Sequence, residues 1–528
     1  MKSILIIFSF LVTGLTTIQA QEAAVKTGEK KAKSVASVNL IRGPYLQVAS
    51  SHSILIRWRT DVSSRSRVKY GTAPGQLTQQ ADDANLVTEH KVSLTNLQPA
   101  TKYYYSIGGF QDVLQGDNEN YFITLPEAGQ TGVYRIGALG DCGDNSINQR
   151  QVKEQVIKYL GDNYMNAWIL LGDNAYSDGT DAEFQSKFFN IYKDDLLKRN
   201  PLFPAPGNHD YHDTDLSAQH AQETHQTAYY QNFSMPAQGE SGGVPSKTQA
   251  FYSFDLGNVH FLSLDSYGKE DSAYRLYDTT GPQVTWIKKD LAENKNKGWV
   301  IAYWHHPPYT MGSHNSDQEE ELIKIRENFI QILERYGVDL VLNGHSHDYE
   351  RSRMMKGHYG PAASFDAAKH NISASSGRYD GADNSAPYVK DSVHNNGTVY
   401  VVSGSAGKLG GKQTTYPHNA MYFSDADHGG ASMLEIQDNR LDLKWICADG
   451  TVRDQFTMMK NVNKHTDIKI KKGQQAVLTA SFVGKYKWNN GNANTRSITV
   501  TPGTGVTKYT VADEFNNIKD TFSVYVSK

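Results

Sequence analysis

Residues 338–351 read VDLVLNGHSHDYER, an apolar run that ends in a polar cluster. Alternate residues of an extended chain share a face, so the imidazoles of His345 and His347 can converge on one point beyond the end of a strand. Gly344 allows the chain to turn sharply there. An isolated His-x-His pair is more often two exposed loop histidines, so its meaning depends on what else the chain brings to the same point.

Four further polar clusters follow apolar runs in the same central part of the chain. They are LGDCGD with Asp141, LLGDNAY with Asp173 and Tyr176, PAPGNHD with Asn208 and His209, and AYWHHPPY with His305 and His306. In open α/β sheets, ligands bind outside the carboxyl ends of the strands, so these loops can meet at one place. Each fragment is weak evidence by itself, but together and in this order they predict a shared site.

Residues 133–459 alternate apolar strands with amphipathic helices, which is typical of an α/β domain. Near-continuous apolar runs such as VHFLSL and WVIAYW predict strands that are buried on both faces. We expect helices at residues 148–160, 181–198, 283–294 and 316–336, the last with an N-terminal cap at Ser316 and a C-terminal cap at Gly337. Two polar excursions, residues 211–249 and 353–396, are either close to the site or solvated insertions.

The regions on either side of this domain have β character. Residues 39–126 contain short alternating strands separated by Pro, Gly and Asn turns, which predicts a small β sandwich. Residues 464–528 also read as short strands and resemble an immunoglobulin-like domain of the kind appended to secreted bacterial enzymes. Attachment, spacing and contact with a surface or glycan are all open roles for this C-terminal domain.

The N-terminus has the features of a secretory signal peptide. Lys2 precedes an apolar stretch from Ile4 to Val12, and Ala20 is a small residue at a suitable cleavage point. We therefore expect a signal peptide at residues 1–20, a linker at 21–38, and a secreted protein, extracellular or periplasmic. The apolar stretch is shorter than the roughly 20 residues that span a bilayer, so no transmembrane segment is expected.

Composition places the chain among soluble multidomain proteins. It has 528 residues, of which 38% are hydrophobic, and a formal net charge of −3. This charge gives no reason to expect binding to nucleic acid or to an anionic membrane. The two cysteines, Cys142 and Cys447, are far apart in sequence and are expected to be buried free thiols. The oligomeric state is left open.

The polar clusters match a known five-block pattern. Asp141, Gly-Asp-x-x-Tyr at 172–176, Gly-Asn-His-Asp at 207–210, His305 and Gly-His-x-His at 344–347 resemble the calcineurin-like metallophosphoesterases, in their purple acid phosphatase branch. The stretch LQPATKYYYSIGG resembles the fibronectin III-like N-terminal domain of that branch. The resemblance covers about residues 39–459. It implies a fibronectin III-like β sandwich, then an α/β domain with a two-sheet sandwich flanked by helices, followed by the immunoglobulin-like domain.

The resemblance also implies a site with two metal ions. Asp141, Tyr176 and His347 correspond to ligands of the first ion, Asn208, His305 and His345 to ligands of the second, and Asp173 to the bridge. Anionic oxygens suit Fe(III) at the first site, whereas imidazoles and an amide suit Zn, Fe(II) or Mn at the second. His209 and His314 correspond to histidines that contact phosphate and protonate the leaving oxygen. His306 is expected in an outer layer or at the surface.

The function implied by the resemblance is a secreted phosphatase. Such an enzyme hydrolyses phosphate monoesters by attack of a metal-bound hydroxide, without a nucleophilic side chain. Two alternatives remain open from the sequence. The same metal site could serve a phosphodiesterase or nucleotidase, and the chain could instead be a non-catalytic surface-binding protein. The complete set of donor residues argues against the second alternative.

Overall fold

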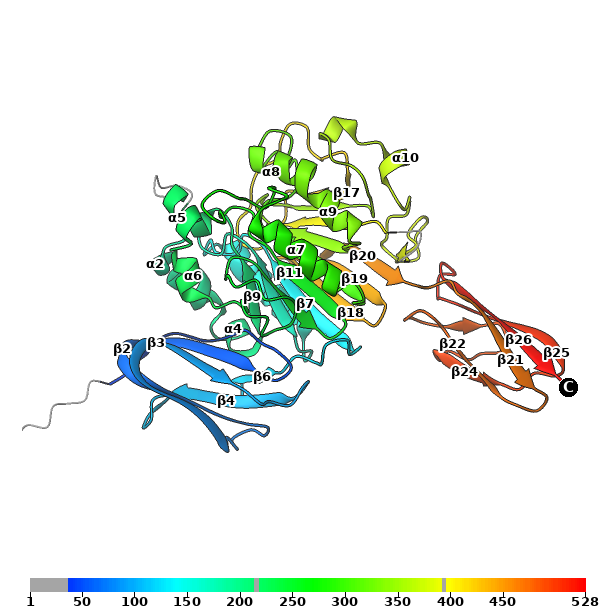
Figure 1. The fold of residues 1–528 in the computed structure, drawn as a ribbon, viewed down its shortest axis with the longest axis horizontal. Coiled ribbons are helices and arrows are strands. Elements are labelled where there is room, and N and C mark those ends of the chain that lie inside the picture. Colours follow the sequence, from blue (N-terminus) through cyan, green and yellow to red (C-terminus); the bar gives the residue numbers. More distant parts are fainter. Residues whose placement is uncertain (1–36, 213–217, 392–395) are drawn as a thin grey trace, which may run out of the picture. The chain divides into compact units, whose positions relative to one another are not determined.

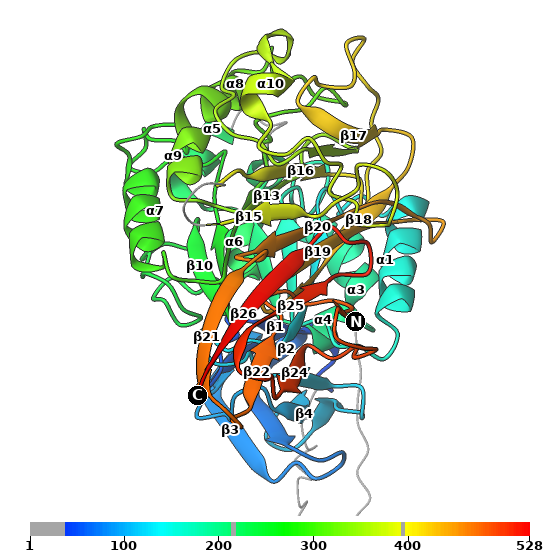
Figure 2. The same ribbon diagram turned by 90° about the vertical axis from the view of Figure 1, so that its right-hand side faces the viewer.

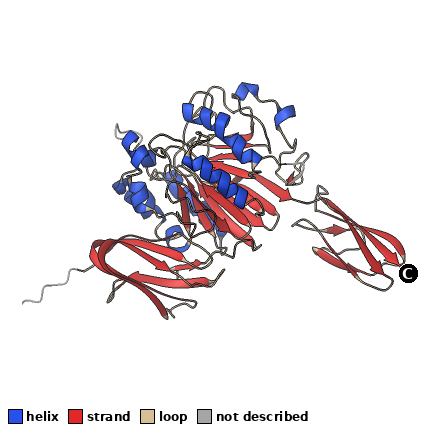
Figure 3. Ribbon diagram, in the orientation of Figure 1, coloured by secondary structure: helices blue, strands red, loops and turns tan. Residues whose placement is uncertain are grey.

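The computed structural model describes residues 37–212, 218–391 and 396–528. The expected signal peptide and nearly all of the expected linker lie outside these residues. The chain from Val38 to Lys528 forms one compact unit. Among the described residues, every helix lies between Ile147 and His370, whereas strands occur throughout (Figures 1 and 3).

The N-terminal part is an antiparallel six-stranded sheet. Its strands are β1 (Leu40–Gln47), β2 (Ile54–Gly71), β3 (Gln79–Leu94), β4 (Lys102–Gly108), β5 (Val113–Gln115) and β6 (Tyr121–Ile123). The long strand β2 pairs with β1, β3 and β4. Its apolar residues Ile54, Ile56 and Trp58 lie two residues apart and are buried, as expected for a strand with one face on a core. The all-β character predicted for residues 39–126 is therefore present.

The central part contains two seven-stranded sheets. One has the order β10-β11-β12-β13-β16-β14-β17 and the other β15-β20-β19-β18-β7-β8-β9. The strands of the first are β10 (Tyr252–Leu256), β11 (Val259–Ser263), β12 (Trp299–Trp304), β13 (Leu340–Asn343), β14 (Tyr349–Ser352), β16 (Val399–Ser403) and β17 (Met421–Asp425). Those of the second are β7 (Val133–Leu139), β8 (Ala167–Leu171), β9 (Leu202–Ala205), β15 (Tyr388–Lys390), β18 (Gly430–Gln437), β19 (Arg440–Cys447) and β20 (Val452–Lys460).

Strand β12 shows why its sequence is apolar throughout. Ile301 and Tyr303 belong to the core between the two sheets, whereas Val300 and Ala302 pack in a second core that includes residues of two helical segments. A strand covered on both faces needs no polar positions. Cys142 and Cys447 are buried free cysteines, as the sequence predicts.

Two of the four predicted helices are continuous and two are interrupted. α1 (Ile147–Leu160) and α7 (Pro282–Glu293) match the predictions closely. The helix expected at 181–198 consists of α2 (Asp181–Glu183), a π-helical turn at Phe184–Phe189, α3 (Asn190–Tyr192) and α4 (Leu196–Arg199). The helix expected at 316–336 consists of α8 (Glu320–Lys324), a π-helical turn at Ile325–Phe329 and α9 (Ile330–Arg335). Periodicity alone does not reveal a change of helix type.

The expected N-terminal cap at Ser316 is wrong. Ser316 Oγ donates a hydrogen bond to the Thr310 carbonyl at 3.0 Å, and the α8 helix begins only after Glu319. Gly337, by contrast, has a φ of 73° directly after the helical segment, as the predicted C-terminal cap requires. The two polar excursions contain short elements, which are α5 (Ala218–Thr224), α6 (Ala228–Asn232), a 3-10 turn at Ala362–Ser364, α10 (Ala367–His370) and the strand β15 of the second sheet.

The C-terminal part has two small sheets. A four-stranded sheet has the order β21-β26-β25-β23, and β22 pairs with β24. The strands are β21 (His465–Lys471), β22 (Ala476–Thr479), β23 (Lys487–Trp488), β24 (Ser497–Val500), β25 (Gly505–Ala512) and β26 (Lys519–Ser527). They enclose a core of their own, which also includes Tyr379 and Met459 from the central part.

Candidate metal centre

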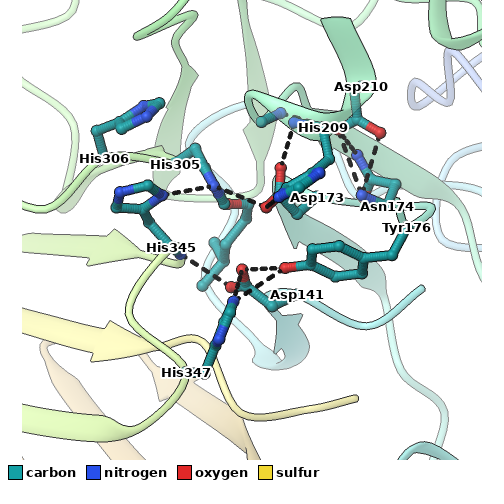
Figure 4. A network of polar contacts seen from close by, with 12 residues as sticks. Asp141, Asp173, Asn174, Tyr176, His209, Asp210, His305, His306, His345 and His347 are labelled. Carbon is teal, nitrogen blue, oxygen red and sulfur yellow. Dashed lines mark hydrogen bonds and ion pairs between the residues drawn. The ribbon is translucent and has the colours of Figure 1, made fainter. Parts of the chain in front are cut away.

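Five loops of the central domain converge beyond the ends of five strands. Asp141 follows β7, Asp173 follows β8 and Asn208 follows β9, and these three strands are parallel neighbours in one sheet. His305 follows β12, and the His345-x-His347 motif follows β13, its parallel neighbour in the other sheet. Figure 4 shows residues from both sheets pointing toward one another. The place predicted from the strand-end rule is therefore where the polar clusters meet.

Asp141, Tyr176 and His347 form the first half of the cluster. Tyr176 Oη donates a hydrogen bond to Asp141 Oδ1 at 2.7 Å, and His347 Nε2 lies 3.2 Å from the same hydroxyl. His347 Nε2 is 3.6 Å from Asp141 Oδ1. The backbone N–H of His345 donates to Asp141 Oδ2 at 2.9 Å. One carboxylate, one phenol and one imidazole thus face a single point.

Asp173, His305 and His345 form the second half. His305 Nε2 is 3.3 Å from Asp173 Oδ2 and 3.3 Å from His345 Nδ1. His305 Nδ1 lies 2.9 Å from the Leu171 carbonyl oxygen, so this nitrogen carries a proton and Nε2 is directed into the cluster. Histidines that bind a metal through one ring nitrogen characteristically donate a hydrogen bond from the other ring nitrogen.

Three of these residues adopt the left-handed backbone conformation. The φ angles are 56° for Asp141, 51° for Asp173 and 68° for His345. This region is sparsely populated by residues other than glycine, and such conformations concentrate at functional sites. Gly344 is required for close approach, because a Cβ at this position would lie 2.6 Å from Asp141 Oδ2. The loops hold their side chains at the expense of local strain.

The electrostatics of the cluster depend on its burial. Burial raises the pKa of Tyr176 well above its usual value, and the carboxylates of Asp141 and Asp173 raise it further. Burial lowers the pKa of His347 to about 3 and that of His345 to about 3. His305 is the exception, because Asp173 more than offsets the effect of burial and raises its pKa to about 9.

The donor set fits positive ions. Asp141 and Asp173 are 0% and 1% exposed, and within the described ranges their ion-pair partners are His209, His305 and His347, with no Lys or Arg among them. Asp141, Asp173 and His305 each offer an atom within 4.8 Å of the others. Buried carboxylates need a compensating charge, and clustered carboxylate and imidazole donors are suited to divalent and trivalent metals.

A cavity of about 290 Å³ opens onto this cluster. Asn208, His209 and His314 line it together with Asp173, His345 and His347. The backbone N–H of His209 donates to Asp173 Oδ1 at 2.9 Å. His314 lies with its ring 3.6 Å from that of His345, centre to centre. All nine residues singled out from the sequence therefore lie at the cluster or its cavity. The cavity has no lining residue from the described parts of the two polar excursions.

Three further residues lie at the cavity, and the structure decides between the two places expected for one of them. His306 is 3% exposed, so it is not at the surface; its Nδ1 lies 2.8 Å from Ser266 Oγ, and its ring is 4.3 Å from that of His345. Glu319 lies 2.9 Å from His314 Nδ1 and 3.2 Å from His345 Nε2. Tyr267 stacks on His306. The acidic residues in the stretch 317–321 are typical of the start of a helix, so nothing in the sequence indicates that Glu319 contacts His314 and His345.

Sequence profiles and relatives agree with this geometry. Residues 134–349 match the calcineurin-like phosphoesterase family, and residues 41–122 match the purple acid phosphatase N-terminal domain. The chain carries the domain pair of the purple acid phosphatases. It is 28% identical to purple acid phosphatase 15 of Arabidopsis thaliana over 58% of this chain and 63% of that protein. It is 26% identical to acid phosphatase type 7 of Homo sapiens over 57% of this chain and 67% of that protein.

The chain spans about half to two thirds of the length of the first relatives it matches. A purple acid phosphatase from yellow lupin (Lupinus luteus) seeds superposes with a TM-score of 0.59 at 20% identity, over 80% of this chain and 74% of that chain. At that identity the match supports the fold alone. The resemblance predicted from the motifs is confirmed, and this family implies a dinuclear metal site.

Proposed function

We propose that the protein is a secreted, metal-dependent phosphatase that hydrolyses phosphate monoesters. The observation that carries the proposal is the convergence of seven donor side chains, from five strand ends in two sheets, on one buried cluster beside a cavity. The relatives named above are phosphatases, and a phosphoenolpyruvate phosphatase of Allium cepa is 25% identical over 80% of this chain and 79% of that protein.

The proposed ligands fall into two groups. Asp141, Tyr176 and His347 would hold one ion, Asn208, His305 and His345 would hold the other, and Asp173 would contact both. Tyr176 and Asp141 offer anionic oxygens, which suit Fe(III). The second group is neutral apart from the shared carboxylate and suits Zn, Fe(II) or Mn. A bound metal pair would supply activation of water and a hold on the phosphate oxygens.

The remaining chemistry belongs to side chains of the cavity. His209 and His314 line the cavity and would donate hydrogen bonds to a phosphate oxygen or to the leaving oxygen. Glu319 accepts a hydrogen bond from His314 Nδ1, which fixes the ring and leaves Nε2 available to the cavity. Tyr267 and His306 form one wall by stacking, with ring centres 5.5 Å apart, and this wall limits the size of the ester group that fits.

The proposal is tested by metal analysis of the purified protein together with hydrolysis of matched monoesters and diesters. We expect two metal ions per chain and a higher kcat/KM for monoesters. Two ions with a preference for diesters would favour the phosphodiesterase alternative. Stoichiometric metal without hydrolysis of either class would favour the binding-protein alternative.

The proposal includes the outer parts of the chain. We propose secretion after cleavage at residue 20, which N-terminal sequencing of exported protein would test by finding Gln21 first. We also propose that residues 39–126 are a fibronectin III-like domain, 133–459 the catalytic domain and 464–528 an immunoglobulin-like domain, with a role in surface or glycan contact. Among the described residues, no helix is long and apolar enough to cross a membrane.

A further inference from the structure

The positive charge of the chain is concentrated in its C-terminal segment. Residues 464–528 hold ten Lys and Arg against four Asp and Glu, a net charge of +6. Because the whole chain carries −3, residues 1–463 carry −9. The small net charge of the chain is therefore the sum of a negative region and a positive region. None of the ten basic residues lines the cavity at the metal centre, so the proposed hydrolysis does not account for them.

Two of the four acids of this segment are buried. Asp513 is buried and accepts a hydrogen bond from the N–H of Ile518 at 2.7 Å. Asp520 is buried and accepts from the backbone N–H groups of Lys464 and Ser481 at 2.7 and 2.6 Å. All nine lysines of the segment are exposed. The surface is thus more basic than the composition indicates.

Strand register places five of the lysines on one face of the four-stranded sheet. β21 runs parallel to β26, with Lys469 opposite Tyr525 and Lys471 opposite Ser527. β25 runs antiparallel to β26, with Val506 opposite Tyr525. Residues that are paired across strands share a face. Figure 2 shows β21, β26 and β25 side by side.

The same strand register places three further lysines on this face. Lys508 is two residues from Val506 on β25, so it shares that face. Ala512 of β25 pairs with Lys519 of β26 and with Lys487 of β23, and it lies an even number of residues from Lys508. We call this surface the basic face. Its lysines are Lys469, Lys471, Lys487, Lys508 and Lys519.

The opposite face of the sheet is the core. Trp488, Tyr509, Val511, Phe522 and Val524 alternate with the residues of the basic face and pack together inside. On the basic face, Val506 is 57% exposed and Tyr525 is 38% exposed, between the lysine-bearing positions of neighbouring strands. The acidic residue at these strand positions is Asp467, which lies 3.1 Å from His465. The basic face is an exposed surface with an apolar centre.

We propose that the basic face docks the protein on an anionic lipid surface. Lysine stems can extend to reach lipid phosphates, and tyrosine is favoured at the level of the headgroups, where its ring is partly buried and its hydroxyl stays hydrated. A soluble polyanion would match the lysines but would leave Val506 and Tyr525 in water. Lipid therefore matches both the charge and the apolar centre. This docking is independent of the proposed hydrolysis.

The expected affinity follows from the lysine count. Each lysine near an anionic surface contributes about fivefold to binding, so removing three predicts a loss of roughly 100-fold. Surface charges are screened by salt, with a Debye length of about 8 Å at physiological ionic strength. Binding is therefore expected to weaken as salt is raised.

The test is co-sedimentation of the purified full chain with vesicles of phosphatidylcholine, alone or mixed with phosphatidylglycerol. The variant is the triple substitution Lys469→Gln, Lys471→Gln, Lys508→Gln. Its control has the same charge change on the central domain, Lys158→Gln, Lys289→Gln, Lys295→Gln, at positions that are also exposed. We expect wild-type and control protein to bind the mixed vesicles in a salt-sensitive way, and the variant to bind roughly 100-fold more weakly. Thermal unfolding of each variant verifies the fold.

Three results would overturn the proposal. The first is no binding to mixed vesicles at low salt. The second is an equal loss in the variant and its control, because only overall charge would then matter. The third is lysine-dependent binding to dextran sulfate without binding to vesicles, which would assign the basic face to a polysaccharide. A third variant, Tyr525→Ser, sharpens the outcome: weaker binding at all salt concentrations supports burial of its ring, and unchanged binding contradicts it.

Discussion

The central domain treats its buried acids in two different ways. Asp454, which is fully buried, lies 2.5 Å from Arg351 Nε and 3.1 Å from Arg378 Nη1. Asp339, also fully buried, lies 2.7 Å from Lys390 Nζ and 2.6 Å from Lys460 Nζ.

Asp141 and Asp173 are as deeply buried, yet their ion-pair partners in the described chain are histidines alone. At Asp454 and Asp339 the chain itself supplies the compensating charge. At the candidate metal centre the chain supplies donor atoms, and the compensating charge would come from bound ions. The metal centre also differs from Asp290, a buried acid whose ion-pair partner in the described chain is His260. It groups two such acids with several imidazoles beside a cavity, and this combination marks a ligand site.

The largest effect is expected from Asp173→Ala, which removes the carboxylate proposed to contact both ions. We expect loss of at least one metal and a fall in kcat of more than about 1000-fold, because metal stabilisation of the transition state contributes several kcal/mol. Metal analysis and hydrolysis assays measure both quantities. The control is Asp144→Ala on the loop between β7 and α1, which should retain both ions. Full metal content with near-normal turnover in Asp173→Ala would remove this residue from the site.

Asp454→Asn tests the other side of the comparison. It removes the carboxylate between Arg351 and Arg378 and leaves buried positive charge uncompensated. We expect a decrease of about 3–5 kcal/mol in the free energy of unfolding, with metal content unchanged in the folded fraction. Denaturant unfolding measures the first quantity and metal analysis the second. Loss of metal from folded protein would mean that the two groups of acids are not separate.

The two adjacent histidines sharpen the comparison within the site. His305→Ala should lower affinity for the second metal by more than about 100-fold, beyond the effect typical of residues that only orient a ligand. His306→Ala should lower it by about tenfold, because His306 contacts the ring of His345. Metal titration of the two variants distinguishes them. A larger loss in His306→Ala would reverse the assignment.

The strand ends and their polar residues could be predicted because both follow local rules. Five apolar runs, each followed by a polar turn, define where chemistry gathers, and all nine predicted residues lie there. Glu319 and the burial of His306 could not be predicted, since they depend on how the loop after β12 packs against the loop after β13. The parallel pairing of β21 with β26 is equally non-local. The lysines of the basic face can be read from the sequence, but the fact that they share one face cannot be predicted from it.

His260 pairs with two acids of the central domain, and we expect its contribution to the free energy of unfolding to depend on pH. It is buried, with Nδ1 2.8 Å from Asp255 Oδ1 and Nε2 2.6 Å from Asp290 Oδ2. Burial lowers its pKa, but hydrogen bonds to Asp255 and Asp290 outweigh burial and raise it above the usual 6.5. The charged form is therefore the stabilising one. Its contribution is complete below pH 6.5 and is lost as pH rises through the folded pKa.

We expect His260→Gln to unfold about 1.5–3 kcal/mol more easily at pH 6, the range for hydrogen bonds to charged groups. The difference from wild type should shrink toward pH 9. Denaturant midpoints across this range measure it. A difference that does not change with pH would mean that His260 is neutral in the folded protein.

The smallest effect on stability is expected from Tyr176→Phe, but it gives the clearest spectroscopic result. Loss of the hydrogen bond from Tyr176 Oη to Asp141 should change the free energy of unfolding by only about 1 kcal/mol. Burial and the two carboxylates raise the pKa of Tyr176, so the phenolate forms only beside a strong positive charge, as bound metals lower the pKa of other ligands. A phenolate on Fe(III) gives a charge-transfer band in the visible range.

Iron-loaded, oxidised protein should therefore be violet to pink, and reduction to the all-ferrous state should bleach it. Tyr176→Phe should be colourless while retaining iron through Asp141, Asp173 and His347. The matched control is Tyr267→Phe, which alters a tyrosine of the cavity wall and should leave the band in place. Zinc- or manganese-loaded protein should be colourless in either case, so iron content must be measured on the same sample. Stoichiometric oxidised iron without a visible band would exclude Tyr176 as a ligand, and it would mean that its hydroxyl serves only to orient Asp141.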